Sequence, residues 1–160
     1  MERDAVFEEL VEAAQASEVS LGTAESVTGG QLAYLMTGEP GVGDVFRGAI
    51  VAYQTSVKRD LLEVPEGPVV SHEAARAMAE GARRLLGCDL AVSITGVAGP
   101  ERQDGQPVGC VFIGLAFRDE PATSGQHFFE GEPDQIRKSA ASTAARVALD
   151  RLTGLRPTAT

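Results

Sequence analysis

A serine lies in a turn whose composition suits nucleophilic chemistry. The stretch Thr23-Ala24-Glu25-Ser26-Val27-Thr28-Gly29-Gly30 joins a run of β-branched and small residues to a segment with helical spacing, so Ser26 is expected on a strand-to-helix turn. The glycine pair, Gly29 and Gly30, allows a ligand to approach the backbone closely, and the first amides of the next helix favour an anion or an oxyanion. The alternative is an ordinary turn in which Ser26 or Thr28 caps the helix.

Two further polar side chains follow a second strand-like run. Residues 47–53 end in Tyr53, and Lys58 lies about one turn into the helix expected at 54–62, so its amine can reach back towards the strand end. A lysine activates a serine when its amine is neutral, which partial burial brings about by lowering its pKa. Tyr53 would then relay a proton or orient the amine. The alternative is that Tyr53 packs at a strand end and Lys58 is a solvated helix lysine.

The hydrophobic pattern predicts the elements that must position these residues. Helices are expected at 4–17, 71–86 and 133–152, and strands at 19–23, 47–53, 90–95, 108–117 and 126–130. In the helix 71–86, Ser71 is the expected N-cap and Gly87 the end, with Ala74, Met78, Ala82 and Leu85 facing inward.

The strand expected at 90–95 is almost continuously apolar or β-branched, which is typical of an interior strand covered on both faces. We therefore expect one α/β domain over residues 1–153, a three-layer α/β/α sandwich with a mixed, mostly parallel sheet, and a flexible tail at 154–160. Ligands of such sheets collect at the carboxyl ends of the strands. Ser26, Tyr53 and Thr95 are expected around one cleft there.

Composition limits the classes of function. The chain of 160 residues has 14 basic and 23 acidic side chains, a net charge of −9 that argues against binding to nucleic acid or an anionic membrane. Two isolated cysteines and two distant histidines form no metal-ligand pattern, so we expect neither a metal nor a cofactor. No secretory leader or long apolar span is visible, and a cytoplasmic location is expected. The sequence leaves a homo-oligomer open.

Beyond single motifs, an ordered set of residues resembles a known family. The set comprises Glu25-Ser26-x-Thr28-Gly29-Gly30, Val45-Phe46-Arg47-Gly48, Val51-Ala52-Tyr53 with Lys58, Thr95-Gly96-x-Ala98-Gly99-Pro100 and Pro107-Val108-Gly109. Over residues 6–152 it resembles the CinA C-terminal domain, a family that includes the stand-alone nicotinamide-nucleotide amidohydrolases, or nicotinamide mononucleotide (NMN) deamidases. The resemblance does not extend to the amino-terminal pyrophosphatase domain of full-length CinA proteins, so no second activity is expected.

The resemblance implies a three-layer α/β/α domain that hydrolyses the carboxamide of NMN to nicotinate mononucleotide and ammonia without a metal, in pyridine nucleotide recycling. It implies Ser26 as nucleophile, Lys58 as general base and Tyr53 as their partner, and it matches Thr95 and Arg137 to substrate contacts. Arg137 would hold the phosphate of the nucleotide, with Arg47 or Arg102 as weaker candidates. The expected substrate-binding amides, including oxyanion donors, are those of Thr28, Gly29, Gly30 and Gly96.

One segment departs from the family pattern. After Gly99-Pro100 the family carries a glycine pair, a threonine and a lysine, whereas this chain has Glu101-Arg102-Gln103-Asp104-Gly105-Gln106. The segment lies beside the expected site, so two alternatives stay open. One is a serine amidase with a different small substrate, and the other is a nucleotide-binding or regulatory module without turnover.

Overall fold

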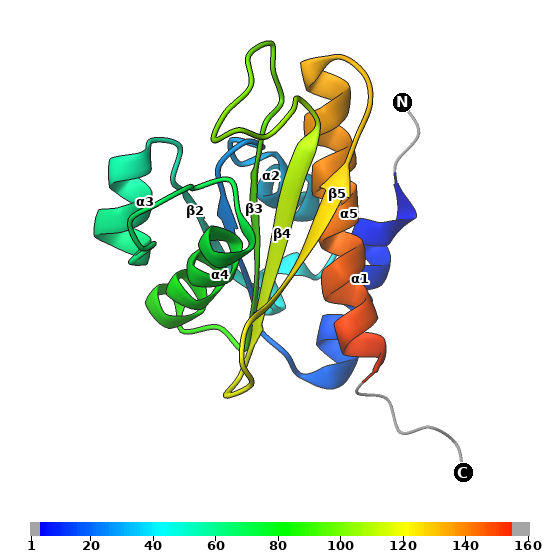
Figure 1. Cartoon of the computed structure of the whole chain (residues 1–160). Coiled ribbons are helices and arrows are strands. Elements are labelled where there is room, and N and C mark those ends of the chain that lie inside the picture. The colour runs from blue at the N-terminus through cyan, green and yellow to red at the C-terminus, as the bar shows by residue number, and fades with distance from the viewer. Residues whose placement is uncertain (1–3, 155–160) are drawn as a thin grey trace.

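The chain folds as a five-stranded sheet between two layers of helices in a computed structural model, which describes residues 4–154 (Figure 1). In chain order the elements are α1 (Ala5–Ser17), β1 (Leu21–Glu25), α2 (Gln31–Thr37), the 3-10 turn η1 (Val42–Asp44), β2 (Phe46–Val51), α3 (Thr55–Leu62), α4 (His72–Leu86), β3 (Leu90–Gly96), β4 (Cys110–Phe117), β5 (Thr123–Phe128) and α5 (Pro133–Thr153). Residues 155–160 of the expected tail lie outside the described residues.

The sheet has the strand order β2-β1-β3-β4-β5. Strand β1 pairs in parallel with both β2 and β3, whereas β4 is antiparallel to β3 and to β5. Four of the five strands therefore point the same way, which confirms the expected mixed, mostly parallel sheet.

Helices cover both faces of this sheet. Figure 1 shows α1, α2 and α5 on one face and α3 and α4 on the other, each group enclosing its own apolar core. The three central strands are buried along almost their whole length, because both of their faces are covered. The expected three-layer α/β/α architecture is confirmed.

The direction of the strands brings the functional candidates to one edge. Ser26 follows the last residue of β1, Tyr53 lies just past the end of β2, and Thr95 lies at the end of β3. Strand β5 runs in the same direction as these three, so α5 also begins at this edge and carries Arg137 in its first turns.

Helix α4 shows where the periodicity argument holds and where it fails. Its expected caps are confirmed, because Ser71 Oγ accepts a hydrogen bond from the Ala74 amide (3.1 Å) and Gly87 ends the helix at φ 61°. Leu85 does not face inward, since it is 48% exposed. Leu86 packs against the core instead, because it continues the four-residue spacing of the buried side chains.

The boundaries of all five strands differ from expectation by one to three residues, and the differences at β5 and β1 have structural consequences. Strand β5 covers Thr123–Phe128 rather than 126–130, because a tight turn with Arg118 at φ 50° reverses the chain directly after β4. Strand β1 begins at Leu21 and includes Glu25, which places that carboxylate on the strand immediately before Ser26.

The carboxylate of Glu25 joins the end of β1 to the start of α2. The residue is fully buried, and four donors surround the carboxylate. Oε1 accepts from Thr28 Oγ1 (2.7 Å) and the Leu32 amide (2.9 Å), and Oε2 accepts from Thr23 Oγ1 (3.2 Å) and the Ala33 amide (3.0 Å). These bonds satisfy the charge, and the positive end of the α2 dipole favours it further.

Glu25 thus supplies acceptor oxygens to the Leu32 and Ala33 amides at the start of α2, as a capping side chain would. The alternative in which Ser26 or Thr28 caps α2 is wrong, because the N-cap position is Gly30, which has no side chain to offer. The turn that carries Ser26 is fixed at its strand end and its helix end by the same carboxylate.

We expect Glu25→Ala to lower the free energy of unfolding by about 3 kcal/mol, because two amides and two hydroxyls lose their buried acceptor. Urea denaturation measures this loss. Glu12→Ala is the control, since Glu12 is an exposed carboxylate on α1 and its loss should change the free energy by no more than about 0.5 kcal/mol. Equal effects of the two substitutions would contradict the structural role of Glu25.

Candidate active site

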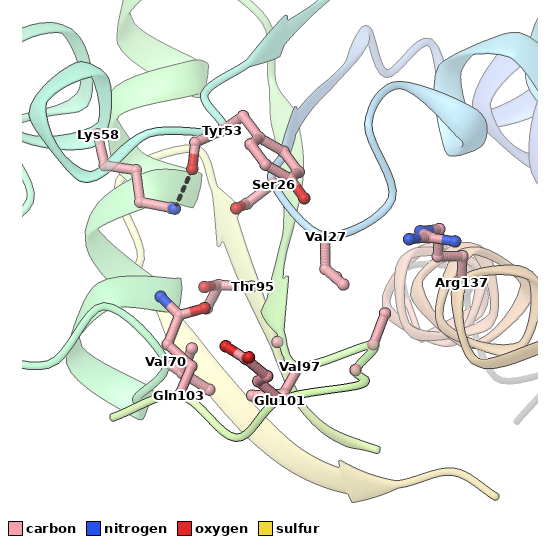
Figure 2. Close-up of a pocket in the computed structure, with 13 residues that line it drawn as sticks. Ser26, Val27, Tyr53, Lys58, Val70, Thr95, Val97, Glu101, Gln103 and Arg137 are labelled. Atoms are coloured by element: carbon pink, nitrogen blue, oxygen red, sulfur yellow. Dashed lines mark hydrogen bonds between the residues drawn. The ribbon is translucent and has the colours of Figure 1, made fainter. Parts of the chain in front are cut away.

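One pocket at the carboxyl edge of the sheet gathers most of the sequence-predicted site residues (Figure 2). Those that line it are Ser26, Tyr53, Lys58, Thr95, Gly96 and Arg137. Thr28, Gly29 and Gly30 are not among its lining residues. The expectation that Ser26, Tyr53 and Thr95 surround one cleft is therefore confirmed.

Ser26 has a fixed backbone and a free hydroxyl. Its amide donates to the Ile94 carbonyl of β3 (3.0 Å), and its own carbonyl accepts from the Gly29 amide (3.0 Å). The residue is 6% exposed, and within residues 4–154 its hydroxyl has no hydrogen-bond partner. Figure 2 shows this hydroxyl at the pocket, on the side where Lys58 lies. An unpartnered hydroxyl on a fixed backbone is available to react.

Lys58 is buried at the same end of the pocket. Lys58 is 2% exposed, and its Nζ donates a hydrogen bond to the Tyr53 carbonyl (2.9 Å). Burial lowers the pKa of this amine below its ordinary value of 10.5, although the Asp104 carboxylate acts in the opposite direction. The alternative of a solvated helix lysine is wrong. A lysine whose pKa is lowered carries more of the neutral amine, which accepts protons.

The contact between Tyr53 and Lys58 differs from the one that sequence reasoning suggested. The Tyr53 main-chain carbonyl, not its phenol, orients the lysine amine. The residue is 68% exposed, and Figure 2 shows its ring extending beside Ser26. A proton relay through the phenol stays a prediction.

Thr95 and Gly96 build the floor of the pocket. The Thr95 hydroxyl donates to the Val69 carbonyl (2.6 Å), which ties the end of β3 to the segment before α4. At Gly96 a Cβ atom would lie 2.8 Å from the Cys110 carbonyl oxygen, so the close approach of the two strands requires glycine there.

Among the described residues, the free backbone donors include one that the sequence indicated, the Thr28 amide, and one that it did not, the Val27 amide. Glu25 occupies the first amides of α2, and the Gly29 amide is bonded to Ser26. The amides of Val27 and Thr28 have no acceptor in the described part of the chain, and Val27 lines the pocket. The amide after a nucleophile is a common oxyanion donor.

Arg137 is the cation at the far side of the pocket in Figure 2. Its guanidinium pairs with Asp134 (2.9 Å), whose side chain is almost fully exposed, so this surface ion pair is weak. Arg47 is not a helper, because it lies outside the pocket and donates to the Leu86 carbonyl (2.6 Å). Arg102 does not line the pocket either.

Sequence reasoning placed the 101–106 segment beside the site but assigned no role to its individual residues. Glu101 and Gln103 line the pocket, and Asp104 acts on the pKa of Lys58. The Asp104-Gly105 dipeptide carried the necessary information, because Asp-Gly favours a two-residue hairpin that folds the segment back on itself.

Other kinds of site find no support in the described residues. Across residues 4–154 no three His, Cys, Asp or Glu side chains gather closely enough to hold a metal ion. Burial raises the pKa of the Cys88 thiol to about 11, which leaves it unreactive. Within the same residues, no helix combines the length and the apolar character needed to cross a membrane.

Comparison with known proteins shows the family of this chain. The model of the CinA C-terminal domain family matches positions 3–152. The chain belongs to this family. It is 41% identical over 128 residues, 77% of its length, to a Lactiplantibacillus plantarum protein named "Putative competence-damage inducible protein", and 36% identical over 145 residues, 88% of its length, to a Bacillus thuringiensis protein of that name. The chain covers only 30% and 35% of the lengths of these CinA relatives.

Solved structures of the CinA superfamily share the fold. A CinA superfamily protein from Klebsiella pneumoniae superimposes with a TM-score of 0.90 at 27% identity, covering 96% of this chain and 99% of that one. The competence/damage inducible protein CihA from Agrobacterium tumefaciens gives 0.84 at 28% identity, with the same coverage.

Lysine-selective NMR tests the state of the buried amine. The chain contains only two lysines, Lys58 and the exposed Lys138, so protein labelled with ¹³C-lysine gives two sets of side-chain signals. Lys58→Met identifies the set that belongs to Lys58. We expect its titration midpoint below 10.5, because burial disfavours the charged form. A midpoint at or above that value would contradict the burial argument.

The pH dependence of the free energy of unfolding is a second measurement of the lowered pKa of Lys58. Between the lowered folded-state pKa and the unfolded value, the unfolded chain binds more protons, so the free energy of unfolding rises with pH across that window. Lys58→Met should lack this rise, whereas Lys138→Met should keep it.

Proposed function

We propose that this pocket hydrolyses the carboxamide of nicotinamide mononucleotide, releasing ammonia and nicotinate mononucleotide, as a step in pyridine nucleotide recycling. The observation that carries the proposal is that one end of a single pocket holds both the Ser26 hydroxyl, which has no hydrogen-bond partner in the described residues, and the buried amine of Lys58. The family resemblance supplies the substrate.

The reaction would proceed through an ester of Ser26. Neutral Lys58 takes the Ser26 proton while Oγ attacks the carboxamide carbon, and the carbonyl oxygen becomes an oxyanion facing the Val27 amide. The carbon–nitrogen bond then breaks as the lysine ammonium returns the proton to the leaving nitrogen, which departs as ammonia. Water attacks the ester, Lys58 accepts a proton from that water, and the proton passes to Ser26 as the acid is released.

Charges around the pocket suit the remainder of a mononucleotide. Arg137 supplies a cation that can hold a phosphate by charge-assisted hydrogen bonds. The Glu101 carboxylate points into the cavity in Figure 2 and suits hydroxyl donors such as those of ribose. Carboxamide, ribose and phosphate would thus each meet a group of matching chemistry.

A serine amidase acting on another small amide is the second candidate. It is favoured by the Glu101 and Gln103 side chains in the pocket, because they belong to the segment that departs from the family pattern. Ammonia release from NMN, nicotinamide riboside, nicotinamide and glutamine separates the two candidates.

Ser26→Ala and Lys58→Met should each lower kcat for NMN by at least about 10³-fold, and the double variant should be scarcely worse, because both changes remove the same step. An enzyme-coupled ammonia assay measures this. Ser56→Ala and Lys138→Met are the matched controls, since both side chains are exposed and outside the pocket. Ammonia release that survives Ser26→Ala would overturn the mechanism, and a parent that binds NMN without turnover would show a binding module.

A further inference from the structure

Residues 101–106 form a short, well-defined hairpin at the mouth of the pocket. The Gln106 amide donates to the Gln103 carbonyl (2.8 Å), and the Gln103 amide donates to the Gln106 carbonyl (3.4 Å). Between them, Asp104 and Gly105 have φ values of 52° and 75°, the two left-handed conformations of a type I′ turn. The turn therefore fixes the directions in which the hairpin side chains leave the backbone.

The side chain of Asp104 attaches this hairpin to the floor of the pocket. Its Oδ2 accepts hydrogen bonds from the amides of Val69 (2.8 Å) and Val70 (3.0 Å). The Val69 carbonyl in turn accepts the Thr95 hydroxyl, and Val70 lines the pocket. A chain of hydrogen bonds thus runs from the end of β3 to the tip of the hairpin.

Gln103 is the hairpin residue that reaches the reacting end. In Figure 2 its side-chain amide points towards Thr95 and the end of the cavity where Ser26 and Lys58 lie, and all four residues line the pocket. That amide has no hydrogen-bond partner within residues 4–154. Gln106, on the same hairpin, is outside the pocket and contacts Cys110 Sγ instead (3.6 Å).

A glutamine amide matches the chemistry of a substrate carboxamide. It carries a donor and an acceptor side by side, so it can donate to the carbonyl oxygen of a carboxamide and accept from its NH₂ group. A carboxylate has no hydrogen to give, and one of its oxygens would then face the glutamine oxygen. A residue of this kind therefore binds the amide and disfavours the acid.

We propose that Gln103 binds the carboxamide of the substrate and that Asp104 is the positioning residue that holds it there. The proposal rests on the proposed function and deepens it, because it assigns the discrimination between amide substrate and acid product to the hairpin. The bonds from Asp104 hold the backbone of the hairpin against residues 69–70, so they set the place from which the Gln103 side chain extends into the pocket.

Binding to inactive protein tests this assignment directly. In a Ser26→Ala background, calorimetry gives the Kd values of NMN and of nicotinate mononucleotide. We expect the amide to bind at least about tenfold more tightly, and Gln103→Leu to reduce that preference to about twofold or less. Gln106→Leu is the matched control on the same hairpin and should keep the full preference.

Two changes at Asp104 separate positioning from folding. Asp104→Ala removes the acceptor of the Val69 and Val70 amides and should reduce the amide preference, whereas Asp104→Asn keeps an acceptor oxygen and should restore most of it. Thermal unfolding of each variant shows whether the fold is retained. A loss of preference in both variants alike would overturn the positioning role.

The outcomes separate this proposal from the proposed function. If the parent releases ammonia from NMN but Gln103→Leu keeps the amide preference, Gln103 does not bind the carboxamide, whereas the deamidase activity is supported. If the parent binds both nucleotides without releasing ammonia, the deamidase activity is contradicted. The ratio of the Kd values of NMN and nicotinate mononucleotide still decides whether Gln103 recognises the amide. A parent that binds neither nucleotide overturns both.

Discussion

The buried carboxylate of Glu25 is the interaction on which the site depends. Its four donors come from β1, from the Ser26 turn and from the first residues of α2, so one side chain fixes the strand, the turn and the helix relative to one another. Because it occupies the leading amides of α2, the site cannot use the N-terminus of that helix for a substrate anion. The free amides of Val27 and Thr28 take on greater importance for the same reason.

Glu25 and Lys58 are both ionisable and both buried near this edge, but they have different roles. Glu25 fixes the turn and does not hold Lys58 in its charged form, since no ion pair joins the two within residues 4–154. Glu25 has every acceptor position filled, and its charge is therefore stabilised. Lys58 has one carbonyl partner, and its burial disfavours the charge. The first group supports the fold, and the second is suited to accept a proton.

Much of this arrangement could be predicted from the sequence. The three-layer fold follows from strand and helix periodicity, and the clustering of Ser26, Tyr53 and Thr95 follows from the shared direction of β1, β2 and β3. The remaining features depend on contacts between residues far apart in the chain. The bonds of Asp104 to the 69–70 segment span about 35 residues, and nothing local to either segment indicates them. The exposed Leu85 shows a different failure, because a stripe of helix residues continues equally well to position 85 or 86.

We propose that Ser26 forms an ester with the acyl group of the substrate, and trapping that ester would be the sharpest test of this step. Hydroxylamine added during turnover of NMN competes with water for an acyl-enzyme and yields the hydroxamate of nicotinate mononucleotide, which mass spectrometry detects. With the parent protein we expect hydroxamate in proportion to the hydroxylamine added, and with Ser26→Ala we expect none. Ammonia release by the parent with no hydroxamate at any hydroxylamine concentration would contradict it, because water would then attack the carboxamide without a covalent intermediate.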